Sequence, residues 1–148
     1  MPESLVRDYM TTNPITLHEN DRLREAVELV MVRRIRHIPV LDSQDRLVGI
    51  VTDRDIKRTL PSPLSSAAPE EYEAILETTA CGHVMTREPF TVEAGAKVAD
   101  AVRILVGSRI GGLPVVEGGI LVGVFTEGDA LGGYLGLLEA TEAAVLRG

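Results

Sequence analysis

Apolar residues recur with a helical period in two segments of the chain, one in each half. They are Leu23, Val27, Val30 and Met31 in the first segment, and Val98, Ala101, Val102, Leu105 and Val106 in the second. Residues spaced three, four or seven positions apart lie on one face of an α-helix. The pattern therefore predicts two amphipathic helices.

Each predicted helix is followed by two short apolar segments that are rich in branched residues. These segments are HIPVLD and LVGIVT in the first half of the chain, and GLPVVE and ILVGVFT in the second. Short branched segments bounded by turn residues are typical of β-strands. Because the polar turns DSQDR and EGG separate the segments, each pair is expected to form a hairpin, and a further helix is expected to begin where the hairpin ends.

The two halves of the chain are copies of one another. VRDYMTTNPITL (residues 6–17) matches CGHVMTREPFTV (residues 81–92) at an offset of 75, and the offset becomes 74 after the hairpin turn. A nearly fixed offset indicates an internal repeat. Each copy is expected to form a strand, a helix, two strands and a second helix. Such a small unit is only marginally stable alone, so the two copies are expected to share one core.

The repeat divides the sequence into four predicted segments. They are a first repeat at residues 1–60, a linker at residues 61–79, a second repeat at residues 80–133 and a helical tail at residues 134–148. The Pro-, Ser- and Ala-rich run LPSPLSSAAP marks the linker, and the EEYEAILET segment after it predicts a short helix. The tail is expected to extend the last helix unless Gly132 and Gly133 interrupt it.

Composition adds to this picture mainly by excluding classes of protein. The 148 residues are 45% apolar and 25% charged, without an uninterrupted apolar run of membrane-spanning length, which is typical of a globular protein. MPESLVRDYM lacks the basic and apolar segments of a secretory signal, so a cytoplasmic location is expected. The net charge is −7, and all the excess negative charge follows residue 60. We therefore expect neither a nucleic-acid nor a membrane partner.

Each copy ends in a Thr-x-x-Asp motif, called the T-x-x-D motif below: Thr52 with Asp55, and Thr126 with Asp129. One interpretation is structural, because this spacing fits a capping box at the start of a helix. The other is a ligand site, because a carboxylate can accept hydrogen bonds from both hydroxyls of a ribose and a helix N-terminus favours a phosphate.

One Gly lies inside each strand that precedes a T-x-x-D motif, at Gly49 and Gly123. Gly weakens a strand unless another backbone or a ligand approaches closely. These two residues therefore predict a close approach beside each motif.

Three ordered motifs occur twice: the opening segments, the strands HIPVLD and GLPVVE, and the closing segments LVGIVTDRD and LVGVFTEGD. On these residues, the chain resembles a stand-alone tandem pair of cystathionine-β-synthase (CBS) domains. The resemblance covers roughly four-fifths of the chain. It implies an α+β fold in which two βαββα repeats pack as a pseudo-twofold pair. It also implies clefts that bind adenosine nucleotides, and a homodimer of face-to-face discs.

The resemblance also implies ligand contacts. Thr52 and Thr126 match the family's sugar- and phosphate-contacting Thr, and Asp55 and Asp129 match its ribose-binding Asp. The adenine ring is expected beside the first and middle strands, where backbone groups read its edge. Those positions are Ile15, Thr16, Ile38 and Pro39 in the first copy, and Phe90, Thr91, Leu113 and Pro114 in the second. The two Pro residues are equally well interpreted as edge-strand residues with no ligand role.

Basic residues are distributed unequally between the copies. Arg36, His37 and Arg54 are the candidates for phosphate contacts in the first copy, because Arg offers phosphate oxygens a fixed fork of donors. The second copy offers mainly Arg109, and it departs from the family's usual basic residues at Gly111, Gly112 and Gly128. A polyphosphate is therefore expected to be held less well by the second copy.

Other chemistry is not indicated by the sequence. The three His residues and Cys81 lack the spacing of zinc ligands, and no nucleophile lies beside a base in a recognisable motif. We therefore expect no metal site and no enzymatic activity, and we expect Cys81 to be a packing residue.

The sequence thus predicts a regulatory sensor that requires no cofactor. AMP, ADP, ATP or S-adenosylmethionine is the expected regulatory ligand, and an unidentified effector protein on a separate chain is the expected target. The alternative is a structural or dimerisation module without a nucleotide ligand, in which the T-x-x-D motifs only cap helices.

Overall fold

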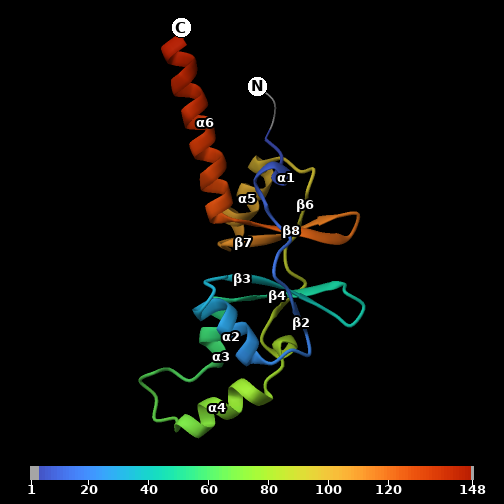
Figure 1. Ribbon diagram of the computed structural model, residues 1–148, viewed down its shortest axis with the longest axis vertical. Helices are drawn as coiled ribbons and strands as arrows, with labels where there is room; N and C mark the ends of the chain where they lie inside the picture. The colour runs from blue at the N-terminus through green and yellow to red at the C-terminus, as the bar shows by residue number, and fades with distance from the viewer. Residues whose placement is uncertain (1–3, 148) are drawn as a thin grey trace. The chain divides into compact units, whose positions relative to one another are not determined.

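The computed structural model describes residues 4–147, so residues 1–3 and 148 of the predicted first and last segments lie outside the described residues. The described chain combines α-helices with two four-stranded β-sheets, which confirms the predicted α+β class. It forms two compact units that can be followed in Figure 1. One unit comprises residues 14–89, and the other joins the residues up to 13 to the residues from 90 on.

The unit of residues 14–89 is built on a sheet with the strand order β2-β3-β4-β5. Its strands are β2 (Leu17–His18), β3 (His37–Leu41), β4 (Leu47–Thr52) and β5 (Thr86–Arg87). Its helices are α2 (Leu23–Met31), α3 (Asp53–Thr59), α4 (Pro69–Thr78) and the 3-10 helix η1 (Cys81–His83). β2 runs parallel to β3, and the other neighbouring strands are antiparallel.

Aliphatic side chains from several of these elements form the core of this unit. Leu23 of α2, Ile38 of β3 and Val51 of β4 are fully buried in one cluster. Cys81 is also fully buried there, which confirms the predicted packing role of this residue. Leu23, Val27 and Val30 of the predicted helical stripe therefore face this core. Met31 is 73% exposed, so its predicted place on the core-facing stripe is wrong.

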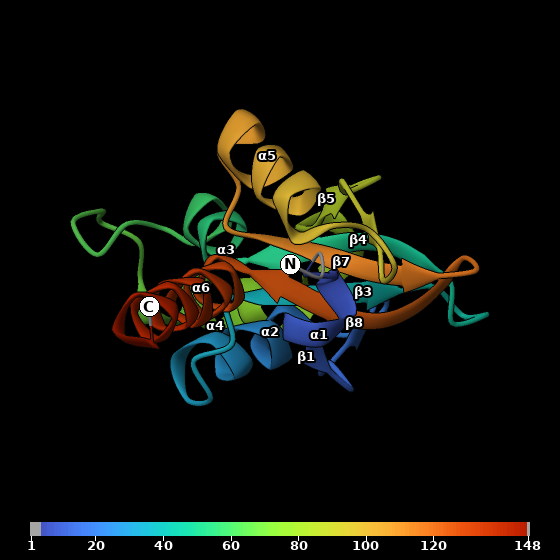
Figure 2. The same ribbon diagram turned by 90° about the horizontal axis from the view of Figure 1, so that it is seen from above.

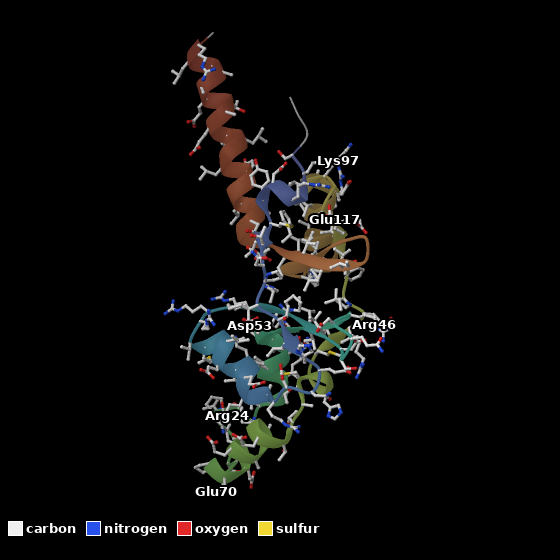
Figure 3. All side chains as sticks on the ribbon, turned by 45° about the vertical axis from the view of Figure 1, so that its right-hand side comes forward. Arg24, Arg46, Asp53, Glu70, Lys97 and Glu117 are labelled. Atoms are coloured by element: carbon white, nitrogen blue, oxygen red, sulfur yellow. The ribbon has the colours of Figure 1, made fainter. Side chains whose placement is uncertain are left out.

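Helix α4 is the helix predicted in the linker. It begins at Pro69, where the missing N–H of Pro removes no helical hydrogen bond. Leu76 inserts into the core with 4% of its surface exposed, while Arg24 of α2 pairs with Glu73 and Glu77 of α4. Figure 3 shows Arg24 on α2, close to α4. An apolar contact and an ionic contact therefore both hold α4 on α2.

The other unit repeats this plan with the strand order β1-β8-β7-β6. Its strands are β1 (Thr11–Thr12), β6 (Val92–Glu93), β7 (Gly112–Glu117) and β8 (Ile120–Thr126). Its helices are α1 (Val6–Tyr9), α5 (Val98–Ser108) and α6 (Glu127–Arg147). Figure 2 shows β7 and β8 side by side. Gly118 and Gly119 join them with positive φ angles of 59° and 80°, as a tight two-residue hairpin turn requires.

Helix α6 includes the whole described tail and continues through Gly132 and Gly133, so these residues do not interrupt it. A Gly costs a helix only about 1 kcal/mol relative to Ala, which is too little to end a helix of 21 residues. In Figure 1 the C-terminal part of α6 runs on beyond the other helices of its unit. No residue of α6 is buried.

The compact units do not coincide with the sequence repeats, because each sheet contains one strand from the opening segment of the other repeat. β5 opens the second repeat but pairs with β4 of the first, with Ile50 opposite Thr86. β1 opens the first repeat but pairs with β8 of the second, with Val124 opposite Thr11. The repeat and the folded unit are therefore two different divisions of the chain.

The exchanged strands β5 and β1 lie against Gly49 and Gly123, respectively. This is the close approach that was predicted from the two glycines. A Cβ added to Gly49 would lie 2.9 Å from the carbonyl oxygen of Thr86, and one added to Gly123 would lie 2.7 Å from that of Thr11. A side chain at either position would collide with the neighbouring backbone. The approaching group is therefore a strand of the protein itself.

Pro39 and Pro114 lie on inner strands, so their interpretation as edge-strand residues is wrong. β3 lies between β2 and β4, and β7 lies between β8 and β6. Pro is tolerated on β3 because β2 is short and pairs only with Val40 and Leu41, so that Pro39 has no partner on that side. Pro114 is in the same position beside the short strand β6.

Candidate ligand sites at the two T-x-x-D motifs

The first T-x-x-D motif joins the end of β4 to the start of α3. The carboxylate oxygen Oδ2 of Asp55 accepts hydrogen bonds from the backbone N–H and the hydroxyl of Thr52, at 2.9 and 3.0 Å. In return, the N–H of Asp55 donates to the Thr52 hydroxyl at 3.2 Å. This reciprocal arrangement is a capping box, so the predicted cap is confirmed.

The second motif has the same geometry at the end of β8. Oδ2 of Asp129 accepts from the N–H and the hydroxyl of Thr126 at 2.9 and 3.1 Å, and the N–H of Asp129 donates back at 3.3 Å. The two carboxylates differ in burial. Asp55 is buried with 7% of its surface exposed, whereas Asp129 is partly exposed.

A second threonine reaches each carboxylate from the exchanged strand. The hydroxyl of Thr86 on β5 lies 3.2 Å from Oδ1 and 3.4 Å from Oδ2 of Asp55. The hydroxyl of Thr11 on β1 lies 3.4 and 3.5 Å from the two oxygens of Asp129. Neither threonine is among the residues predicted from the sequence to bind a ligand. Their only sequence signal is their identity at equivalent positions of the two repeats.

The middle strand of each sheet lies directly beside the motif. His37 is opposite Thr52, and Pro39 follows two positions along the same strand pair. In the other unit, Gly112 is opposite Thr126 and Pro114 occupies the equivalent place. The structure thus brings the predicted positions Ile38, Pro39, Leu113 and Pro114 next to the motifs. Their side chains are fully buried, so any ligand contact would be made by the backbone, and their predicted role stays a prediction.

Thr16 and Thr91 immediately precede the short strands β2 and β6. Thr16 belongs to the unit that contains Asp55, and Thr91 belongs to the unit that contains Asp129. Thr16 is half-buried and Thr91 is exposed. Their contact with an adenine ring stays a prediction.

The predicted phosphate-binding residues lie at or beside the ends of the elements that adjoin the motifs. Arg36 precedes β3 directly and is exposed, His37 begins β3 and is half-buried, and Arg54 is exposed in the first turn of α3. In the other unit, Arg109 is exposed and ends α5 with a left-handed φ of 53°. Within residues 4–147, no carboxylate forms an ion pair with Arg36, Arg54 or Arg109. These three guanidinium groups are therefore available to an anion.

Two features concern other chemistry. Burial raises the pKa of the Cys81 thiol to about 12, so the reactive thiolate is not populated at neutral pH. Within the described part of the chain, no group of three or more His, Cys, Asp or Glu side chains could hold a metal ion.

A groove of about 1110 Å³ lies between α5 and α6 in the unit that contains Asp129. Its lining is largely apolar and includes Val102, Val106, Leu131, Tyr134 and Leu137. Lys97, Asp100, Arg103 and Glu127 supply its charged groups. This composition differs from that of the T-x-x-D motifs.

None of the helices that the structure describes has the length and hydropathy needed to cross a bilayer.

Comparison with known proteins places this geometry in context. The family model of the CBS domain matches residues 6–62 and 81–136. A CBS domain-containing protein of Dictyostelium discoideum is 29% identical over 136 residues, which are 91% of this chain and 94% of that protein. For several other curated relatives, the chain spans only 20% to 40% of their length.

Two solved structures resemble the chain over nearly its whole length. CBSX2 of Arabidopsis thaliana in complex with AMP has a TM-score of 0.74 at 28% identity, and the match covers 90% of this chain and 98% of that one. The CBS domain pair of protein MJ0100, in complex with 5′-methylthioadenosine and S-adenosyl-L-methionine, has a TM-score of 0.74 at 29% identity. That match covers 91% of this chain and 98% of the other.

Proposed function

The chain belongs to the CBS-domain family, and we propose that it is a regulatory module that binds an adenosine compound at its T-x-x-D motifs. The bound ligand alters the activity of an effector protein on a separate chain. The proposal assigns no catalytic step to this chain. The cytoplasmic location of the protein stays a prediction from the sequence.

The repeated geometry of Asp55 and Asp129 is the observation that carries the proposal. Each carboxylate is fixed at the end of a strand by the N–H and the hydroxyl of its own motif threonine. A fixed carboxylate can accept hydrogen bonds from the two hydroxyls of a ribose, and each such bond contributes about 1.5–3 kcal/mol. The structures of two similar proteins contain adenosine compounds, which supports this assignment.

The unit that contains Asp55 is the stronger candidate for a phosphorylated ligand. Arg54 lies within its motif and Arg36 directly precedes β3, and no carboxylate of the described chain is paired with either residue. The unit that contains Asp129 has Gly128 where the first motif has Arg54. We therefore propose that AMP, ADP or ATP binds preferentially at Asp55, and that the second motif favours an adenosine compound without a long phosphate chain, such as S-adenosylmethionine.

Calorimetric titration of nucleotide-free protein tests the proposal. AMP should bind to the wild-type protein, and Asp55→Asn should remove the tighter site because an amide no longer offers two anionic acceptors to the ribose. Asp129→Asn should leave that site intact. Asp53→Asn is the matched control, since Asp53 is a neighbouring carboxylate outside the T-x-x-D pair. Equal AMP binding by Asp55→Asn, Asp53→Asn and wild type would refute the assignment.

One observation favours the alternative of a dimerisation module. Helix α6 carries a series of exposed apolar side chains and has no buried residue. They are Leu131, Tyr134, Leu135, Leu137, Leu138, Val145 and Leu146. Exposed apolar surface of this extent is typical of an association surface, which fits the predicted homodimer. If this is the whole function, sedimentation will show a dimer while titration shows no binding of AMP, ADP, ATP or S-adenosylmethionine.

A further inference from the structure

The chain passes between its two compact units at two places, after residue 13 and after residue 89. The exchanged strands β1 and β5 lie immediately before these crossings. Asn13 and Glu88 occupy equivalent positions in the two crossings and have left-handed φ angles of 49° and 48°. Each is followed by a Pro. Both crossings therefore combine an exchanged strand, an unusual backbone conformation and a rigid Pro.

The carboxylate of Asp55 is already occupied by hydrogen-bond donors. Oδ2 accepts from two groups of Thr52, and the hydroxyl of Thr86 is shared between Oδ1 and Oδ2. An ionised carboxylate has about four acceptor positions in total. A ribose that offers two hydroxyls can therefore bind only if one of the present donors leaves.

Thr86 is the donor that can leave. Thr52 is the N-cap residue of α3, and losing the bond from its N–H to Asp55 would break the capping box of the helix. The hydroxyl of Thr86 belongs to an exposed strand of only two residues, and water can replace Asp55 as its partner. The same distinction holds between Thr126 and Thr11 at Asp129.

We propose that Thr86 and Thr11 are positioning residues that act as ligand-released latches on the two crossings. This proposal rests on the proposed function. Without ligand, each threonine holds its exchanged strand against the carboxylate of the other repeat. A ribose that takes both oxygens of the carboxylate displaces the threonine and loosens β5 or β1. The ligand thereby acts directly on the two segments that connect the units.

Hydrogen exchange of residues 84–90 tests the latch in the intact chain. AMP, or S-adenosylmethionine if AMP does not bind, should speed exchange of this segment by about 10- to 150-fold, the range expected when one hydrogen bond to a charged group is lost. In Thr86→Val, exchange should be fast without ligand, and ligand should change it no further. The ligand should bind at least as tightly as to wild type, because no donor has to leave.

Two controls separate the latch from a general loss of structure. Thr86→Ser keeps the hydroxyl and should restore the wild-type response. Thr141→Val removes a hydroxyl that donates to the carbonyl of Leu137 within α6, and it should behave as wild type. Thr11→Val repeats the test at the other crossing, read at residues 9–14, and remains available if Thr86→Val folds poorly.

The latch is wrong if bound ligand leaves exchange of residues 84–90 unchanged or slows it in wild type. It is also wrong if Thr86→Val keeps the response, or binds the ligand more weakly, which would make Thr86 a ligand contact. If wild-type protein binds none of the adenosine compounds, the proposed function fails and the latch fails with it. Calorimetry on wild type distinguishes that result from failure of the latch alone.

Discussion

At the scale of single residues, Asp55 and Asp129 each cap a helix with a carboxylate that can also accept hydrogen bonds from other groups. Both aspartates cap a helix with Oδ2, and both meet a threonine of the other repeat with Oδ1. The capping bonds fix where the carboxylate lies, whereas the threonine bond can be exchanged for a ligand. Structural capping and ligand binding, which the sequence leaves as alternatives, are therefore compatible in one residue.

Gly49 is required by the backbone that passes beside it. In Gly49→Ala the new Cβ would meet both the side chain of Met85 and the carbonyl oxygen of Thr86. We expect a loss of about 1–3 kcal/mol in the free energy of unfolding, as for other overpacked sites. Gly107→Ala is the control: this position on α5 has no atom within 4 Å of an added Cβ, and Ala should stabilise the helix by about 0.5–1 kcal/mol. Similar denaturation midpoints for both variants would contradict the predicted steric conflict.

His18 titrates above its ordinary range. Its Nε2 atom lies 3.0 Å from Oδ1 of Asp45, and this hydrogen bond, helped by the negative charges of Asp21 and Asp42, raises the pKa of His18 above 6.5. Stability from this pair is fully present below pH 6.5 and is lost as pH rises through the raised pKa. An NMR titration of the imidazole should show the raised value in wild type and a lower one in Asp45→Asn. The same pKa in both proteins would contradict the assigned cause.

At the scale of secondary-structure elements, α4 is tied to its unit mainly by one apolar side chain. Leu76 is 4% exposed, whereas the ionic contacts of Arg24 with Glu73 and Glu77 lie at the surface, where ion pairs contribute little. Leu76→Ala should lower the free energy of unfolding by about 2–5 kcal/mol. Leu64→Ala, at a side chain that is 96% exposed, should change it by less than about 0.5 kcal/mol. Equal urea midpoints for the two variants would show that α4 is not anchored through Leu76.

Most helices and the hairpins can be predicted from the sequence because each is encoded by a local pattern. The stripe at Leu23 and Val27 becomes α2, and the branched segments become β3 and β4. The capping boxes follow from Thr and Asp at a fixed spacing. These signals involve residues that are close in the chain, so one sequence is sufficient to recognise them.

The exchange of β1 and β5 could not be predicted in the same way. A strand of two residues has no periodicity, and the partner of Thr86 on β4 lies more than thirty positions away. Gly49 signals that something approaches it, but the sequence does not distinguish a strand from a ligand. The contacts of Thr11 and Thr86 with the carboxylates are therefore apparent only in the structure.

At the scale of the whole molecule, the chain consists of two units of the same plan, each with its own T-x-x-D motif and each completed by a strand of the other repeat. The units are connected by two crossings, and the exchanged strand before each crossing carries a threonine that contacts one of the candidate ligand-binding carboxylates. This connectivity gives a ligand at either motif a direct route to the chain segments between the units. It is the physical basis of the proposed latch.

The most direct test of this account is thermal unfolding of nucleotide-free protein with and without AMP, ADP, ATP and S-adenosylmethionine. A ligand at a hundred times its dissociation constant stabilises the native state by about 2.7 kcal/mol. For a chain of this size, that corresponds to an increase of several degrees in Tm. We predict such an increase with at least one of these compounds, and its loss in the Asp55→Asn, Asp129→Asn double variant. An unchanged Tm with all four compounds would contradict the proposed adenosine sensor.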